Sequence, residues 1–396
     1  MEYVKFDGIE KKVSKFFMGT FGMFPDNKEK HFQTLDAAFD LGITAIDTAR
    51  AYDSEPTVGE WLKTRGNREE IVLLSKGAHP SDYRERVTPY DIDSDLAETL
   101  AELQTDYLDI YLLHRDNTAL PVGPIVEKLN EHQAAGRIRI FGGSNWTHTR
   151  LEEANEYAYA HNLNPMSVSS PNFSLAEQVK NPFAPGCVTI AGNNNAEAQA
   201  WYTKNQMPVL AYSSLARGLF SGRITRELLA EHPDQIDQFC RIGYCYEENF
   251  VRLDRCKEIA EEKGCTIPQV AMAYVLDCPM NAFPIIGAAN RSEIESSLGA
   301  LKVKLTPQEV LYLEVKEDSR KYYNKRRCAI LQINGDPITL RRLHIALFLQ
   351  NEQAEINMYR KGKRSIQKRR NVYGTWKSRK ISKKRIDHRD RCGAIL

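Results

Sequence analysis

The sequence predicts an α/β protein whose main part is a (β/α)8 TIM barrel, with an N-terminal β-hairpin and a basic C-terminal extension. Three observations support this: eight short apolar runs recur along the chain, amphipathic stretches separate most of them, and the sign of the charge changes near Ser319. Parallel strands that alternate with helices can close into a barrel when there are eight of them. An open doubly wound sheet is the alternative, but such sheets usually have fewer strands.

The expected strands are mostly apolar rather than alternating, as strands covered on both faces should be. In chain order they are "SKFFMGT", "ITAIDTA", "IVLLSKG", "LDIYLLH", "IRIFGGSN", "MSVSSPN", "PVLAYSS" and "AFPIIGA". Helical spacing appears between them in "DIDSDLAETLAEL", "PVGPIVEKLNEHQAAG" and "NFVRLDRCKEIAEEKG". Before the first strand, "YVKFDGIEKKVSKF" predicts a hairpin around Asp7 and Gly8 that closes the bottom of the barrel.

The composition is that of a soluble globular enzyme, with 42% hydrophobic and 27% charged residues and a net charge of +2. No apolar run approaches the roughly 18 residues that a membrane span needs, and the N-terminus has no apolar signal core. Eight cysteines without a CxxC pair argue against a disulfide scaffold or a zinc site. We therefore expect a cytoplasmic protein with reduced thiols, no bound metal and no membrane partner.

The near-neutral charge conceals two parts of opposite sign. Residues 319–396 carry 22 Lys and Arg against 5 Asp and Glu, a net of +17, whereas residues 1–318 carry 32 against 47, a net of −15. We place a domain boundary there, between a barrel of residues 1–318 and a basic tail of residues 319–396, which we expect to be largely disordered.

Polar side chains end three successive strands of the expected barrel. Asp47, Lys76 and His114 close them, and Tyr52 lies just beyond the first. In a (β/α)8 barrel these ends meet at one mouth, where active sites lie. A single Lys or His at a strand end is more often a rim residue than a catalyst, but this combination favours catalysis.

The four side chains predict one kind of chemistry. A free phenol has a pKa of about 10 and is a poor proton donor at neutral pH. The Lys76 ammonium, held by the Asp47 carboxylate, is expected to lower the pKa of Tyr52 toward the working range. With His114 orienting the substrate, the set can protonate a carbonyl oxygen while a hydride arrives at its carbon.

At these residues the sequence resembles the aldo-keto reductase family. The motifs are "IDTARAYDSEPTVGEWLK", "LLSK", "LDIYLLHRD", "FGGSNW", "LAYSSLARGLFSG" and "FPIIGAANRSEIESSL", and the resemblance spans about residues 3 to 316. It implies reversible reduction of an aldehyde or ketone to an alcohol with NADP or NAD. It also implies that Tyr52 donates the proton, that Lys76 and Asp47 tune it, and that His114 orients the substrate.

The cofactor is implied by the resemblance alone, because the chain has no G-x-G-x-x-G fingerprint. The loops after strands seven and eight offer glycines, hydroxyls and a helix N-terminus, as barrel phosphate sites do. The resemblance implies that Ser144 and Asn145 hold the nicotinamide amide, that Tyr212 stacks on its ring, and that the pyrophosphate lies near Ser213, Leu215, Arg217 and Gly218. Further implied cofactor contacts are Thr20, Ser170, Gly287, Ala288, Arg291, Glu293 and Ser297.

The sequence departs from the family pattern at a few of these places. Ser170 stands where the family often has Gln, and Phe173 where it often has Tyr. Ala289 and Glu293 stand where the family usually carries cationic or amide side chains. The fold is unaffected, but the preference between NADPH and NADH stays open. Substrate choice is expected to depend on Tyr83, Arg84, Trp146 and the segment 219–250.

Two function classes remain at this point: an NAD(P)H-linked reductase of a small-molecule carbonyl substrate, and a cofactor-binding regulatory or scaffold subunit with little turnover. The presence of all four catalytic residue types favours the enzyme, as a monomer or small homo-oligomer. The tail "SIQKRRNVYGTWKSRKISKKRIDHRDRCGAIL" has the composition of a nucleic-acid- or membrane-associated arm. A solvated tail without function is the favoured alternative, because nothing in the resemblance requires these residues.

Overall fold

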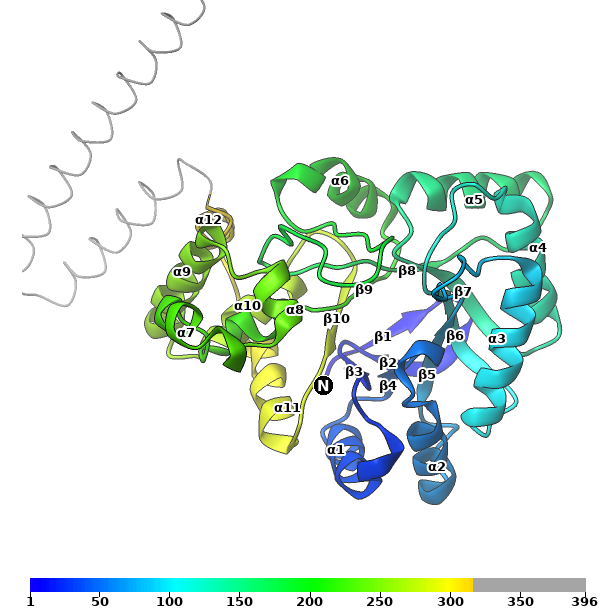
Figure 1. Cartoon of the computed structure of the whole chain (residues 1–396), viewed down its shortest axis with the longest axis horizontal. Coiled ribbons are helices and arrows are strands. Elements are labelled where there is room, and N and C mark those ends of the chain that lie inside the picture. The colour runs from blue at the N-terminus through cyan, green and yellow to red at the C-terminus, as the bar shows by residue number, and fades with distance from the viewer. Residues whose placement is uncertain (316–396) are drawn as a thin grey trace, which may run out of the picture. The chain divides into compact units, whose positions relative to one another are not determined.

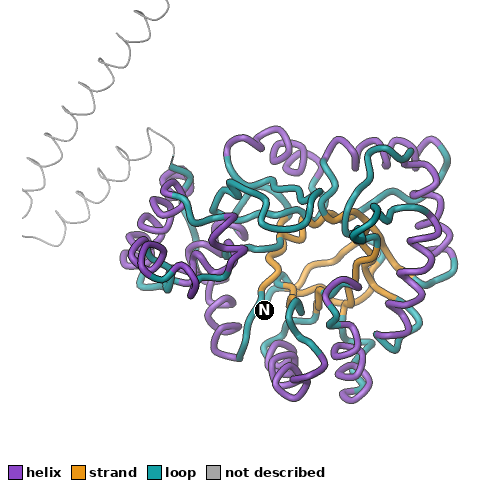
Figure 2. Tube along the Cα trace, in the orientation of Figure 1, coloured by secondary structure: helices purple, strands orange, loops and turns teal. Residues whose placement is uncertain are grey.

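The computed structural model describes residues 1–315, which form a closed barrel ringed by helices (Figures 1 and 2). Its strands are β1 (Tyr3–Phe6), β2 (Ile9–Ser14), β3 (Phe17–Gly19), β4 (Ala45–Asp47), β5 (Val72–Gly77), β6 (Leu108–Leu113), β7 (Ile138–Ser144), β8 (Val168–Ser170), β9 (Val209–Ala211) and β10 (Ala282–Ile286). Its α-helices are α1 (Lys28–Asp40), α2 (Glu55–Arg65), α3 (Pro89–Glu102), α4 (Val122–Ala134), α5 (His148–Ala160), α6 (Ala196–Asn205), α7 (Arg226–Glu231), α8 (Gln238–Gly243), α9 (Glu247–Lys263), α10 (Ile267–Leu276), α11 (Arg291–Leu298) and α12 (Pro307–Leu313). The predicted boundary near Ser319 and the basic tail lie outside the described residues and stay predictions.

The barrel closes in the order β10-β3-β4-β5-β6-β7-β8-β9, and all neighbouring strands are parallel. Each of the eight apolar runs contains one of these strands, so the fold prediction is confirmed. The pairing is uneven around the wall: five residue pairs align β6 with β7, whereas β8 and β9 align at Ser169 and Val209. An isolated bridge between Asn172 and Tyr212 extends this thinner seam.

The predicted N-terminal hairpin is also confirmed. β1 and β2 pair antiparallel around a turn in which Gly8 has a φ of 86°, and a Cβ there would lie 2.8 Å from Ile140 Cγ2. The hairpin buries Phe6, Ile9 and Val13 in the barrel core. The Phe6 ring meets the Phe283 ring edge-on, with centroids 4.9 Å apart. The hairpin therefore closes the end of the barrel at which the strands begin.

Hydrophobic side chains fill the lower barrel because alternate residues of each strand face inward. The inward set includes Val72 and Leu74 from β5 and Ile110 and Leu112 from β6. All residues of β5 and β6 are buried, because helices such as α3 cover their outer faces. A core of this kind leaves only the last inward position of each strand free for function.

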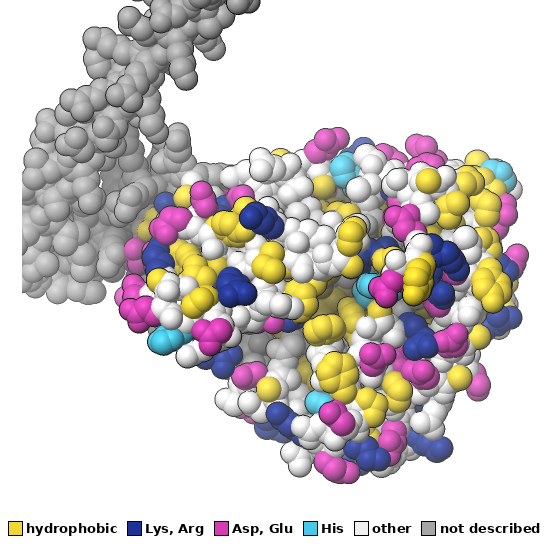
Figure 3. Space-filling model, in the orientation of Figure 1, with side chains coloured by type: hydrophobic (Ala, Val, Ile, Leu, Met, Phe, Trp, Pro, Cys, Tyr) yellow, Lys and Arg dark blue, Asp and Glu magenta, His cyan; other side chains and the backbone are white. Residues whose placement is uncertain are grey.

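The outer surface of the described residues carries acidic and basic side chains in a mixed pattern, and hydrophobic side chains gather near the centre of the face drawn in Figure 3. Among residues 1–315 no helix is both long and apolar enough to cross a membrane.

Candidate active site

The inner face of the barrel changes from apolar to polar at the last inward position of the strands. Leu74 and Leu112 belong to the core, and two residues further along β5 and just beyond β6 the chain reaches Lys76 and His114. The same two-residue step leads to polar side chains from other core positions as well, and on β7 two such steps lead from Ile140 through Gly142 to Ser144. The residues reached in this way are Asp47, Lys76, His114, Ser144, Ser170 and Tyr212.

Lys76 joins the predicted acid and phenol. Its Nζ donates to Asp47 Oδ1 at 2.6 Å and to the Thr48 carbonyl oxygen at 3.0 Å, and lies 3.4 Å from the Tyr52 hydroxyl oxygen. Tyr52 ends a short 3-10 turn, Arg50–Tyr52, and Asp53 follows with a φ of 53° that turns the chain into α2. The structure therefore brings Asp47, Tyr52 and Lys76 together, as the sequence analysis predicted.

His114 completes the group from the next strand. Its ring meets the Tyr52 ring edge-on, with centroids 5.5 Å apart, and the His79 ring packs 4.9 Å away. The backbone N–H of His114 donates to the Gly77 carbonyl oxygen at 2.7 Å, which fixes the position of the residue. Its buried Nδ1 has no hydrogen-bond partner among the described residues. A buried polar atom of this kind needs a partner, which a bound molecule can supply.

Burial dominates the electrostatics of the acid and the phenol. Desolvation raises the pKa of Asp47 against the opposing effect of Lys76. Desolvation also raises the pKa of Tyr52, while the nearby Lys76 charge lowers it. The expected net fall in the Tyr52 pKa is therefore wrong for the protein without bound ligands. Desolvation destabilises the phenolate more than the Lys76 ammonium stabilises it.

The other two groups have the charge states that proton donation requires. Burial alone would lower the pKa of Lys76, but Asp47 and Tyr52 outweigh it and raise that pKa above its ordinary value. Burial, followed by the charges of Lys76 and Arg115, holds the pKa of His114 well below its ordinary value. At neutral pH the site therefore presents an ammonium, a neutral imidazole and a neutral phenol.

Asn145 links this group to the predicted nicotinamide residues. Its Nδ2 donates to the His114 carbonyl oxygen at 3.1 Å and to Ser144 Oγ at 3.2 Å, and its Oδ1 accepts from the Tyr212 hydroxyl at 2.8 Å. The Val188 N–H donates to the same Oδ1 at 3.0 Å. The Asn145 amide is thus fully used within the protein, at a φ of 59° that few residues other than glycine adopt.

Ser144 and Ser170 lie side by side next to this amide. Ser144 Oγ donates to the Ser170 carbonyl oxygen at 3.0 Å, and Ser170 Oγ donates to the Leu210 carbonyl oxygen at 2.8 Å. Each hydroxyl donates its one proton within the protein; Ser144 Oγ, which also accepts from Asn145 Nδ2, keeps one acceptor lone pair, and Ser170 Oγ keeps two. These two oxygens are suited to accept from an N–H₂ group.

The predicted pyrophosphate loop follows β9. Ser213, Ala216, Arg217 and Gly218 have positive φ angles of 54°, 51°, 55° and 95°. Backbone of this kind can form a concave surface of N–H groups that binds anions. Leu215 and Arg217 are half-buried in this loop, and Arg217 pairs with Asp237 at 3.1 Å.

The loop after β10 holds the remaining predicted residues. Gly287 is exposed, Ala288 is half-buried, and the Asn290 side chain caps α11 by accepting from the Glu293 N–H at 3.1 Å. Glu293 Oε2 accepts from the Ala289 N–H at 3.0 Å, and Ser297 Oγ donates to the Glu293 carbonyl oxygen. This loop therefore presents a carboxylate close to the helix N-terminus.

Arg291 is the predicted cation of the same loop. It pairs with Asp40 at 3.4 Å and with Glu295 at 3.0 Å. Its charge is therefore already shared between two carboxylates on the surface.

Thr20 and Trp146 lie inside the wall rather than on its surface. Thr20 is fully buried, and its Oγ1 donates to the Asp47 carbonyl oxygen at 3.1 Å and contacts Ser54 Oγ at 2.9 Å. Trp146 is also fully buried and donates to the Arg115 carbonyl oxygen at 3.2 Å. The expectation that Trp146 contributes to substrate choice does not fit a side chain with no exposed surface.

Sequence reasoning missed Arg115, His79 and Cys187. Arg115 is 7% exposed, and its charge acts on the pKa values of Tyr52, His114 and Tyr212. The signal for Arg115 was its position in "LLHRD", directly after His114. His79 and Cys187 are on loops, and nothing in their local sequence marks them.

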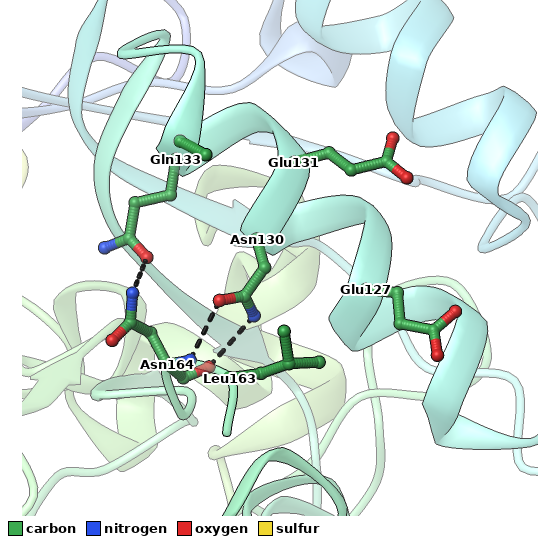
Figure 4. A pocket seen from close by; sticks show the side chains of 7 residues that line it. Glu127, Asn130, Glu131, Gln133, Leu163 and Asn164 are labelled. Carbon is green, nitrogen blue, oxygen red and sulfur yellow. Dashed lines mark hydrogen bonds between the residues drawn. The ribbon is translucent and has the colours of Figure 1, made fainter. Parts of the chain in front are cut away.

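A surface pocket of about 600 Å³ lies elsewhere, between α4 and the segment 163–164. Asn130 and Gln133 on α4 hydrogen-bond Asn164 across it (Figure 4). It contains none of the predicted site residues. Within the described part of the chain no three His, Cys, Asp or Glu side chains form a group that could hold a metal ion.

Comparison with known proteins agrees with this fold. The sequence model of the Aldo/keto reductase family matches residues 15–318. The chain is 27% identical to the aldo-keto reductase YhdN of Bacillus subtilis, over 75% of this chain and 87% of that protein. It is 26% identical to an aryl-alcohol dehydrogenase [NADP(+)] of Phanerodontia chrysosporium, over 74% and 77%.

A solved structure also resembles the chain. An aldo-keto reductase from Klebsiella pneumoniae in complex with NADPH superposes with a TM-score of 0.57 and 25% identity, over 76% of this chain and 90% of that one.

Proposed function

Because the chain belongs to the aldo/keto reductase family, we propose that it reduces an aldehyde or ketone to an alcohol, with Tyr52 as the proton donor. The observation that carries the proposal is the position of Lys76 Nζ, 2.6 Å from Asp47 Oδ1 and 3.4 Å from the Tyr52 hydroxyl. The reaction is reversible, so the same residues also serve oxidation of the alcohol.

The residues present fit a nicotinamide dinucleotide. Ser144 Oγ and Ser170 Oγ keep acceptor lone pairs for a carboxamide N–H₂ group. The Tyr212 ring lies beside them as a surface for a planar ring. The positive-φ loop 213–218 suits a pyrophosphate, and Glu293 at the N-terminus of α11 suits a ribose hydroxyl of the adenosine better than a phosphate. When bound, NADP or NAD supplies the hydride.

Tyr52 acts on the carbonyl oxygen of the substrate. That oxygen gains negative charge as the bond at its carbon forms, and the Tyr52 proton neutralises it. The Lys76 ammonium stabilises the phenolate left behind, and the Asp47 carboxylate holds Lys76 in place. The raised pKa of Tyr52 keeps its proton in place until the carbonyl oxygen becomes basic.

His114 positions the substrate rather than exchanging its own proton. Its pKa lies well below the ordinary value, so the imidazole is neutral at physiological pH. A neutral imidazole can donate one hydrogen bond to a carbonyl oxygen without competing with Tyr52 for the proton. The buried, unpartnered ring nitrogen matches this task.

Aromatic side chains near the acid favour an aromatic carbonyl compound. Phe21 is 55% exposed and meets the Tyr52 ring edge-on, with centroids 5.3 Å apart. Phe183 in turn meets the Tyr212 ring at 6.2 Å. The relative from Phanerodontia chrysosporium is named an aryl-alcohol dehydrogenase. We therefore place aryl aldehydes first among the substrates to be tried.

The test is a steady-state assay with purified protein, NADPH or NADH, and a panel of aryl and alkyl aldehydes. Loss of the absorbance of the reduced nicotinamide, dependent on both protein and aldehyde, is the expected result. The Tyr52→Phe variant is the matched blank for slow background reduction. Tight dinucleotide binding without turnover on any aldehyde would instead identify a regulatory subunit of this fold.

A further inference from the structure

Four cationic side chains are buried in the described part of the chain, and they differ in their partners. Lys76 pairs with Asp47, Arg150 with Asp116 and Glu153, and Arg252 with Glu177. The fourth is Arg115, which is 7% exposed, as Arg150 is. No aspartate or glutamate of residues 1–315 forms an ion pair with Arg115.

The contacts of Arg115 are with neutral groups. Its Nη1 donates to the His114 carbonyl oxygen at 2.8 Å, and its Nε donates to the Pro185 carbonyl oxygen at 3.3 Å. A guanidinium has five N–H donors, so most of them have no carbonyl or carboxylate acceptor among residues 1–315. Buried charges are as a rule paired, because taking one out of water is costly.

The location of this unpaired charge is the barrel mouth. Arg115 directly follows His114, and its charge influences the pKa values of His79, Cys187 and Tyr212 as well as that of Tyr52. Both neighbouring imidazoles have lowered pKa values, so neither adds charge at neutral pH. Lys76 and Asp47 cancel each other, which leaves a net positive charge at the mouth.

We propose that Arg115 is a substrate-binding residue that takes a carboxylate, so that the preferred substrates are carbonyl compounds carrying an anionic carboxylate group. The inference rests on the proposed function, since it assumes that the carbonyl group meets Tyr52 and His114. A planar carboxylate matches the guanidinium in charge and can accept two parallel hydrogen bonds from it.

The phosphates of the dinucleotide are not the expected anionic partner of Arg115. The residues suited to bind them are in the loop after β9, whereas Arg115 follows β6 on the side of His79 and His114. The nicotinamide ring next to Tyr212 is neutral when reduced and positive when oxidised. The negative charge that Arg115 lacks therefore has to come from the substrate.

The experiment compares two aldehydes of the same shape, para-formylbenzoate and para-formylbenzamide, on the full-length protein. The variants are Arg115→Met, which removes the charge, and Arg115→Lys, which keeps it. Arg139→Met is the matched control, because Arg139 is exposed near the start of β7, at the end of the barrel away from the mouth, and forms no ion pair among residues 1–315. Both kcat/KM and the calorimetric Kd of each aldehyde are measured, and circular dichroism checks the fold of each variant.

The wild type should prefer the benzoate over the benzamide by about tenfold or more. For the benzoate, Arg115→Met should lower kcat/KM and raise Kd by about 10- to 100-fold, the size expected for a charge-assisted pair. For the benzamide, both quantities should change less than about threefold. Arg115→Lys should recover part of the preference, and Arg139→Met should behave as the wild type.

Three outcomes would overturn the inference: no preference for the benzoate in the wild type, equal losses for both aldehydes in a folded Arg115→Met, or an effect of equal size in Arg139→Met. Turnover of the benzamide with no binding of the benzoate would support the proposed reductase activity and reject the proposed role of Arg115. Arg115-dependent binding of the benzoate without any turnover has the opposite meaning: it supports the anion site and rejects the proposed reaction.

Discussion

The two sides of the barrel mouth are built in different ways. On the side proposed for catalysis, called the catalytic side below and defined by β4 to β6, Asp47, Lys76 and His114 are at most 6% exposed and are fixed by hydrogen bonds within the wall. On the cofactor side, defined by β8 to β10, β8 and β9 align at a single residue pair. Most of the proposed cofactor residues there belong to loops, in which Ser213 and Arg217 have positive φ angles and the side chains are half-buried or exposed.

The difference shows where the molecule needs fixed geometry. Proton transfer depends on small changes in distance, so its groups are buried and locked before the substrate arrives. A dinucleotide makes many weaker contacts over a long surface, and loops can adjust to it. We therefore expect changes on the catalytic side to affect the rate and changes on the cofactor side to affect cofactor choice.

The largest expected effect comes from the catalytic side. Tyr52→Phe should lower kcat about 10²- to 10⁴-fold, the usual value of general acid catalysis, and leave the Kd of the dinucleotide unchanged. Stopped-flow turnover and fluorescence titration of the reduced cofactor measure the two quantities. Tyr159→Phe on the exposed face of α5 is the control and should have no effect. A Tyr52→Phe enzyme with more than about half of the wild-type kcat would show that another group donates the proton.

Lys76→Met tests whether the catalytic side is held together by its ion pair. It should lower kcat by about 10²-fold and lower the free energy of unfolding by about 3–5 kcal/mol, because it leaves Asp47 buried and unpaired. Adding Asp47→Asn should restore most of the stability, measured by urea unfolding, without restoring kcat. If the double variant is no more stable than Lys76→Met, the loss of stability in Lys76→Met comes from the lost packing of the Lys76 side chain and not from the unpaired Asp47 charge.

Glu55 provides a pH test of the support behind the catalytic side. It is fully buried, accepts from Ser75 Oγ at 2.5 Å and from Thr99 Oγ1 at 3.3 Å, and burial raises its pKa from 4.5 to about 7. A raised pKa in the folded state means that its contribution to stability is complete below about pH 4.5 and is lost as the pH rises through about 7.

The variant Glu55→Gln isolates this contribution. The stability of the wild type relative to Glu55→Gln should fall by up to about 3 kcal/mol between pH 5 and pH 8.5, at 1.36 kcal/mol for each pKa unit. Urea midpoints across that pH range measure the difference. A difference that is independent of pH would mean that Glu55 is ionised in the folded protein throughout.

A smaller effect is expected from the cofactor side. Ala289 offers no charge, Glu293 is an anion, and Arg291 is paired with two carboxylates, so we predict that NADH is used at least as well as NADPH. Glu293→Arg should shift the kcat/KM ratio toward NADPH by about tenfold, or roughly 1.4 kcal/mol. Glu293→Gln is the control, because it removes the charge but can still accept from the Ala289 N–H. A wild type that prefers NADPH a hundredfold would show that Arg291 leaves its partners to bind the phosphate.

The smallest effect is expected outside both sides. Deleting residues 319–396 should leave kcat, KM and the melting temperature nearly unchanged, because the last strand ends at Ile286 and the last described helix at Leu313. The deletion should also remove any salt-sensitive binding to RNA or anionic vesicles. An insoluble or inactive truncation would place the tail on the barrel and move the domain boundary.

The contrast between the two sides also explains how far the sequence could be interpreted. The grouping of residues on the catalytic side could be predicted, because Lys76 and His114 each follow a mostly apolar run and the strand ends of a barrel converge. The cofactor side was reached only through the family resemblance, because loop positions such as Leu215 and Gly287 carry no such pattern. The hydrophobic periodicity of a strand and the position of a residue along it can be read from the sequence, whereas the conformation of a loop depends on the whole fold.

Burial was the other property that the sequence could not supply. It reverses the expected direction of the Tyr52 pKa, because desolvation outweighs the Lys76 charge. It also makes Arg115 conspicuous, since an arginine in "LLHRD" looks ordinary until its missing carboxylate is known. For Arg291 the sequence likewise does not show the ion pair with Asp40, because Asp40 belongs to α1, far away in the chain.

The closing of the barrel by the N-terminal hairpin has a consequence for biosynthesis. Phe6 packs on Phe283, and Phe17 of β3 pairs with Ile285 of β10, so the hairpin and β3 find some of their partners only after β10 has been synthesised. At about 5–20 residues per second, roughly 15–60 s separate the synthesis of Phe6 from that of Phe283, and during this time the hairpin is only partly covered. Nascent chains stalled before residue 282 should therefore be the form of this protein that binds chaperones most strongly.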